Sequence, residues 1–128
     1  MALLPLFSML CLPLALGLSA AGPAAPAPLT LALHAQATLA PAQLLTLDSV
    51  QDSRCPQGAQ CIQQGQLIYQ LRLRVGDSEI PFSLSRANPS VSAAGWQFTL
   101  DPEREPERIR LHAPAPAYFI VLHLRPAP

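Results

Sequence analysis

Lysine is missing from this chain, and charge as a whole is scarce. All eight basic residues are arginine, eight acidic residues balance them, and charged residues make up 12% of the sequence. Such a balance leaves no surplus of positive charge to attract nucleic acid or an anionic membrane surface. We therefore expect no nucleic-acid partner, and no membrane contact beyond an N-terminal export leader.

The motifs of catalysis and of metal binding are also missing. The sequence contains no Gly-x-Ser-x-Gly elbow, phosphate-binding loop or His-Glu-x-x-His motif. His34, His112 and His123 have no metal-ligand spacing. The sequence therefore predicts a protein that is not an enzyme, with no catalytic residues, no metal site and no cofactor.

The first 21 residues have the features of an export signal. They carry no charged side chain, and leucine dominates residues 3–18. Small residues follow, with Ser19 and Ala21 at the positions that signal peptidase reads, so we expect a helical leader that is cleaved after Ala21. The alternative is an uncleaved membrane anchor, because the apolar run approaches the length that spans a bilayer.

The position of Cys11 within this leader decides how many cysteines remain after cleavage. Lipidation would need a small residue before the cysteine, and Leu10 stands there. We therefore expect Cys11 to be lost with the leader. Residues 22–28 read Gly-Pro-Ala-Ala-Pro-Ala-Pro, which predicts an extended linker, and one folded domain is expected over residues 29–128.

Alternation of apolar and polar residues predicts strands along the expected domain. The clearest strand is residues 66–75, with Tyr69 and the leucines on one face. Gly76-Asp77 favours a hairpin turn after it, and Pro81 confines the next strand to a sheet edge or a bulge. Further strands are expected within residues 29–34, 44–50, 80–84, 96–100 and 118–124.

Six or seven short strands with turns between them are typical of a small β-sandwich. The expected fold is an all-β, antiparallel, Ig-like sandwich that follows the signal-peptide helix, and a partly open β-barrel is the alternative. Trp96 is expected in the core. Residues 101–110 combine mixed charges with two prolines, which predicts a solvated loop.

Two cysteines remain after cleavage, and both lie in residues 50–65 with five residues between them. In an exported protein this pair predicts a Cys55–Cys61 disulfide. Pro56 and Gly58 let the chain reverse direction between the cysteines. Closing so short a ring stabilises the fold by at most about 2.4 kcal/mol.

Asp52, Ser53 and Arg54 stand directly before the first of these cysteines. The Asp52 carboxylate can accept backbone N–H bonds in an Asx-type turn, and Arg54 can pair with it or with a nearby carbonyl. Two roles stay open, a polar clasp that holds the loop or a recognition surface. The candidate binding residues are Asp52, Ser53, Arg54, Pro56, Gly58 and Gly65.

The loop resembles that of a family of small bacterial secreted proteins and lipoproteins. Their pattern is Asp-Ser-Arg-Cys-Pro-x-Gly-x-x-Cys-x-x-x-Gly followed by a strand, and residues 52–65 match it. The family's Trp-Ala-Gly-Glu after the second cysteine is replaced by residues 63–66, Gln-Gln-Gly-Gln. The resemblance implies an envelope location and a loop between strands, and it implies no activity.

These observations predict a secreted or periplasmic protein that acts as a non-catalytic binding or structural module. The expected partner is an envelope protein or a cell-wall component that contacts residues 52–65. The alternative is a periplasmic protein that binds a metal ion or a small ligand. The sequence leaves the oligomeric state open.

Overall fold

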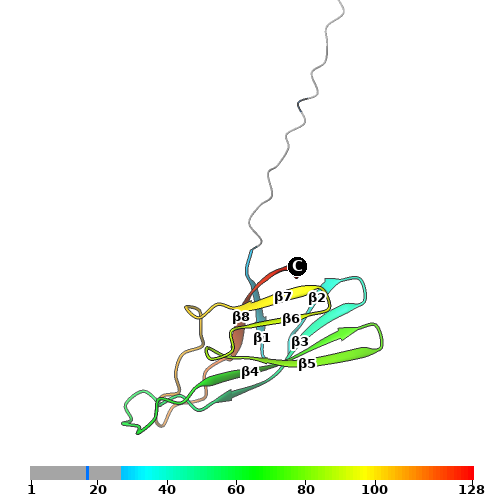
Figure 1. Cartoon of the computed structure of the whole chain (residues 1–128). Coiled ribbons are helices and arrows are strands. Elements are labelled where there is room, and N and C mark those ends of the chain that lie inside the picture. The colour runs from blue at the N-terminus through cyan, green and yellow to red at the C-terminus, as the bar shows by residue number, and fades with distance from the viewer. Residues whose placement is uncertain (1–16, 18–26) are drawn as a thin grey trace, which may run out of the picture.

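The computed structural model describes residues 17 and 27–128, so the expected leader and most of the expected linker lie outside the described residues. The described part contains eight β-strands (Figure 1). They are β1 (Leu29–Ala32), β2 (Gln36–Ala40), β3 (Gln43–Asp52), β4 (Leu67–Val75), β5 (Ser78–Leu84), β6 (Ser90–Ala93), β7 (Trp96–Leu100) and β8 (Phe119–Pro126). Within the same residues, no helix is long and apolar enough to cross a membrane.

The strands form two antiparallel sheets of four strands each, with the orders β1-β8-β7-β6 and β2-β3-β4-β5. The chain crosses between the sheets after β1 and after β5, and each remaining connection joins neighbouring strands. Strand β1 pairs with the last strand, with Leu29 opposite Leu122. The prediction of an all-β antiparallel fold is confirmed. The alternative of a partly open barrel is wrong, because strand pairing never passes from one sheet to the other.

Strand β4 shows how the alternating pattern places the core. Leu67, Tyr69, Leu71 and Leu73 are buried on one face, and the residues between them are not. They join buried residues of β1, β3, β5, β7 and β8 in one cluster, so both sheets share a core in a sandwich-like arrangement. Burial of this cluster is the main force that holds the sheets together.

The predicted hairpin after β4 is present, with Val75 opposite Ser78 across the turn. Gly76 adopts a φ of 58° there, which a glycine reaches without steric cost. Pro81 lies on β5, an edge strand, as its missing N–H requires.

Trp96 corrects one expectation, because its side chain is only half-buried. The indole N–H donates a hydrogen bond of 2.8 Å to the Gln43 side-chain oxygen. This bond joins β7 to β3 and therefore links the two sheets at their surface. A fully buried tryptophan would have needed a partner for that N–H inside the apolar core.

Candidate functional site

The connection between β3 and β4, residues 53–66, is named here the disulfide loop. Its two ends continue the pairing of these strands through backbone bonds from Ser53 N to Gln66 O, 2.9 Å, and from Cys55 N to Gln64 O, 3.1 Å. The Ser53 hydroxyl also accepts a bond of 3.0 Å from the Gln66 N–H. The base of the loop is thus as ordered as the strands from which it comes.

The predicted disulfide between Cys55 and Cys61 is confirmed, and their Cα atoms lie 5.8 Å apart. Cys55 is half-buried and Cys61 is exposed, so the bridge ties the exposed half of the loop to its base. Ile62, the next residue, is fully exposed to solvent. The loop therefore presents an apolar side chain directly beside its covalent bridge.

Gly65 is required by the close approach of the two loop ends. Its φ of 64° lies in the left-handed region, and a side chain there would collide with the backbone carbonyl of Ser53. Gly58 also has a positive φ, of 87°, but open space surrounds it. The sequence pattern contains both glycines, and only the structure separates their roles.

Asp52 and Arg54 form an ion pair at the base of the loop. Arg54 Nε lies 2.9 Å from Asp52 Oδ1, and Nη2 lies 3.0 Å from Oδ2. The backbone N–H of Arg54 donates to Oδ1 as well, at 3.1 Å, which is the predicted Asx-type turn. The Tyr118 hydroxyl donates to Oδ2 at 2.9 Å from the far end of the chain. We call Asp52, Arg54 and Tyr118 the clasp.

The Arg54 guanidinium also binds the loop between β7 and β8, residues 101–118. Its Nη1 donates to the Pro106 carbonyl at 2.8 Å, and its Nη2 donates to the Glu107 carbonyl at 3.0 Å. A further backbone bond of 2.7 Å runs from Gln57 N to the Ile109 carbonyl. Figure 1 shows the two loops side by side at one end of the molecule.

These bonds correct the expectation that residues 101–110 form a simple solvated loop. The segment is a loop, but Pro106 is buried and only 17% of the Glu105 side chain is exposed. The reason is that two backbone carbonyl groups of this segment accept hydrogen bonds from Arg54, so the segment lies against the clasp. Composition alone carries no sign of this contact, because Arg54 and Pro106 are 52 residues apart.

The clasp keeps both of its charges. Burial acts to raise the pKa of Asp52, but the hydrogen bonds from Arg54 and Tyr118 outweigh it and hold the pKa below its ordinary value. Only 4% of the Asp52 side chain and 9% of the Arg54 side chain are exposed. The clasp geometry that the sequence suggested is therefore present, and most of the Arg54 donors already have acceptors within the chain.

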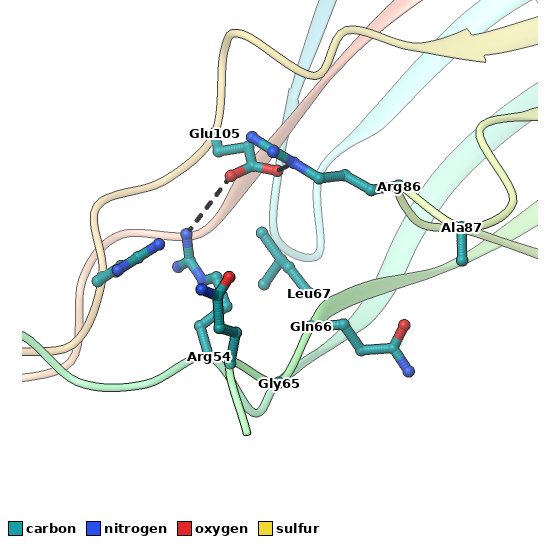
Figure 2. A pocket seen from close by; sticks show the side chains of 9 residues that line it. Arg54, Gly65, Gln66, Leu67, Arg86, Ala87 and Glu105 are labelled. Carbon is teal, nitrogen blue, oxygen red and sulfur yellow. Dashed lines mark hydrogen bonds and ion pairs between the residues drawn. The ribbon is translucent and has the colours of Figure 1, made fainter. Parts of the chain in front are cut away.

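A pocket of about 250 Å³ lies beside the clasp. Its walls come from the disulfide loop, the first residue of β4, the turn after β5 and the loop after β7. It is lined by Arg54, Gln64, Gly65, Gln66, Leu67, Arg86, Ala87, Glu105 and Arg108. Figure 2 shows the side chains of Arg54 and Arg86 directed at Glu105. Arg86 Nε lies 2.7 Å from the Glu105 carboxylate, and Arg54 Nη1 lies 3.8 Å from it.

The structure divides the predicted site residues into two groups. Asp52, Ser53, Arg54 and Gly65 meet at the base of the loop, and Arg54 and Gly65 also line the pocket. Pro56 is half-buried and Gly58 is exposed, and the Pro56 carbonyl accepts a 3.2 Å bond from Ala59 N. Sequence reasoning missed Arg86, Glu105, Arg108 and Tyr118, which no motif marks and which only the fold brings to this place.

Across residues 17 and 27–128, no three histidine, cysteine, aspartate or glutamate side chains gather closely enough to hold a metal ion. His123 Nε2 lies 3.2 Å from Asp101 Oδ2, at the exposed surface. The Tyr69 hydroxyl is buried without a hydrogen-bond partner among the described residues, and burial raises its pKa.

Comparison of the chain with protein-family models, with curated proteins and with solved structures finds no match.

Proposed function

We propose that this chain is an exported, non-catalytic binding module of the bacterial envelope, secreted or periplasmic after cleavage behind Ala21. The uncharged apolar leader and the likeness of residues 52–65 to small bacterial secreted proteins and lipoproteins support this location. The fold we propose is an Ig-like sandwich in its architecture, with meander connections in place of the Ig strand order.

We further propose that the disulfide loop is the recognition surface. The observation that supports this most is the fully exposed Ile62 on a loop that is fixed at its base. The disulfide, the clasp and the bond from Gln57 to Ile109 all restrain the loop before any partner arrives. A restrained loop loses little conformational entropy on binding, so more of the contact energy remains as affinity.

The chemistry of the loop suits a protein partner with an apolar pocket. Residues 55–66 carry no charge and are rich in glutamine, so Ile62 is surrounded by uncharged hydrogen-bonding groups. An apolar anchor within a polar rim is the usual composition of an interface hot spot. Transfer of one isoleucine side chain from water to such a pocket is worth about 1.5–3 kcal/mol.

The test is a photo-crosslinking experiment on the full chain in native envelopes. A photoactivatable residue replaces Gln63 beside the proposed anchor, and the control places it at Asp77, in the turn at the other end of β4. We expect one discrete adduct from position 63 and none from position 77. The adduct should disappear with Ile62→Ser and persist with Leu111→Ser, which removes another exposed apolar side chain.

Three results would contradict the proposal. The absence of a discrete adduct from position 63 would mean that the loop has a structural role. An adduct that survives Ile62→Ser would mean that this side chain is not the anchor. An adduct to a cell-wall component would replace the protein partner with a glycan or peptide partner.

A further inference from the structure

The structure points to a second binding site, distinct from the loop tip. We propose that the pocket beside the clasp binds the carboxylate group of a small ligand. Its lining has three arginines, Arg54, Arg86 and Arg108, against one carboxylate, Glu105. This inference rests on the pocket and not on the proposed recognition by Ile62.

The charged side chains of the pocket differ in how many partners they have within the chain. Glu105 forms ion pairs with Arg86 at 2.7 Å and with Arg54 at 3.8 Å. Arg54 also binds Asp52 and donates to two backbone carbonyls. Arg108 lines the pocket and is exposed, and it takes part in no ion pair or side-chain hydrogen bond within residues 27–128. Arg108 is thus the cation that a ligand would meet.

Polar and apolar groups of the lining complete the site. Arg86 uses Nε and Nη2 for Glu105 and for the Pro102 carbonyl, at 2.7 and 3.0 Å, which holds its guanidinium in place. Gln64 brings a side-chain amide, which can donate to an oxygen atom, whereas the Gln66 side chain is directed away from Arg54 and Glu105 in Figure 2. Leu67 supplies an apolar wall for the carbon part of a ligand, and it lies between the arginines in Figure 2.

The size and charge of the pocket favour a monoanion. A volume of about 250 Å³ is below the roughly 300–1,000 Å³ typical of pockets for drug-sized ligands, so the ligand is small or enters by one group. Asp52 lies behind Arg54 and, with Glu105, offsets two of the three positive charges. A dianion such as phosphate would leave excess negative charge, whereas one carboxylate balances the site. The guanidinium fork also matches the planar geometry of a carboxylate.

The test is an NMR titration of the full chain with named probes. Propionate is compared with propionamide, which has the same shape without the charge, and with inorganic phosphate. We expect a saturable shift of the Gln64 side-chain amide with propionate, and at least tenfold weaker binding of propionamide and of phosphate. Trialanine with a free C-terminus carries a carboxylate and its amidated form does not, so binding of the free form alone is expected and equal binding of the two forms would contradict the proposal.

Variants make the assignment specific. Arg108→Gln should weaken propionate binding at least tenfold, whereas Arg110→Gln, which removes an exposed arginine two residues away, should change it less than twofold. Ile62→Ser should leave the titration unchanged, so that failure of the loop proposal is distinguishable from failure of this one. Equal binding of propionate and propionamide, tighter binding of phosphate, or unchanged binding by Arg108→Gln would overturn the inference.

Discussion

At the scale of single residues, Arg54 joins more of the molecule than any other described side chain. It binds the end of β3 through Asp52 and the loop after β7 through two carbonyls, and Asp52 in turn binds Tyr118 just before β8. The Asp52 pairing could be predicted because the two residues are neighbours in sequence. A carbonyl partner for Arg54 was also expected, but neither the particular carbonyls nor the Tyr118 contact could be predicted, since 52 to 66 residues separate the partners and nothing local encodes them.

The variant Arg54→Lys tests this central role. Arg54→Lys keeps the charge but loses the planar fork that binds both carboxylate oxygens and two carbonyls together. We expect the free energy of unfolding to fall by about 2–3 kcal/mol, because buried acceptors lose charge-assisted bonds. Urea denaturation at pH 7 measures this change in the free energy of unfolding. Arg74→Lys is the control, because Arg74 is exposed and makes one bond of 3.2 Å to the Gly76 carbonyl. Equal losses in the two variants would refute the role of Arg54.

At the scale of elements, strands with strong alternation could be predicted and weak ones could not. Strand β4 has leucines and Tyr69 on one face, and its limits and orientation follow from that pattern. Strands β2 and β6, with the sequences QATLA and SVSA, were missed. Their small and polar residues have little strand preference of their own, and pairing with β3 and β7 holds them in the sheets.

The disulfide loop contains a matched pair of glycines for a test at this scale. Gly65→Ala must accept a left-handed backbone, at about 1–2 kcal/mol, and must also move the Ser53 carbonyl away. Gly58→Ala has only the cost of the left-handed backbone, because no atom lies close enough to collide with the added side chain. We therefore expect Gly65→Ala to be less stable than Gly58→Ala by at least about 1 kcal/mol in urea denaturation. Similar stabilities would show that the close approach of the loop ends is not important for the fold.

At the scale of the whole molecule, the core and the candidate site follow different rules. The core could be predicted because its buried residues come from β1, β3, β4, β5, β7 and β8, the strands whose apolar patterns are visible in the sequence. The pocket is formed by three separate connections, after β3, β5 and β7, and each contributes residues that are unremarkable alone. The sequence therefore located the disulfide loop, whose motif is continuous, and not the arginine-lined pocket beside it.

Acid stability depends on this whole arrangement. Burial tends to raise the pKa of Asp52, but bonds from Arg54 and Tyr118 lower it overall. The Glu103 backbone N–H is the main cause that lowers the pKa of Asp101, with help from His123 and Arg104. A carboxyl group whose folded pKa lies below its unfolded value binds protons more readily in the unfolded state. The stabilisation that such a carboxyl group contributes is therefore complete at pH values above its pKa in the unfolded chain, about 4. This stabilisation is lost as the pH falls below that pKa.

We accordingly expect the free energy of unfolding to be nearly constant from pH 7 to pH 5 and to fall steadily below pH 4, as measured by urea denaturation. Asp52→Asn should already have a lower free energy of unfolding at pH 7. This free energy should also fall less steeply in acid, because the variant lacks the carboxyl group whose pKa differs between the folded and the unfolded chain. Asp77→Asn changes an exposed turn residue and should keep the full slope. An acid slope in Asp52→Asn as steep as that of the unchanged chain would mean that protonation of the clasp does not drive acid unfolding, and that carboxylates elsewhere hold the two loops together.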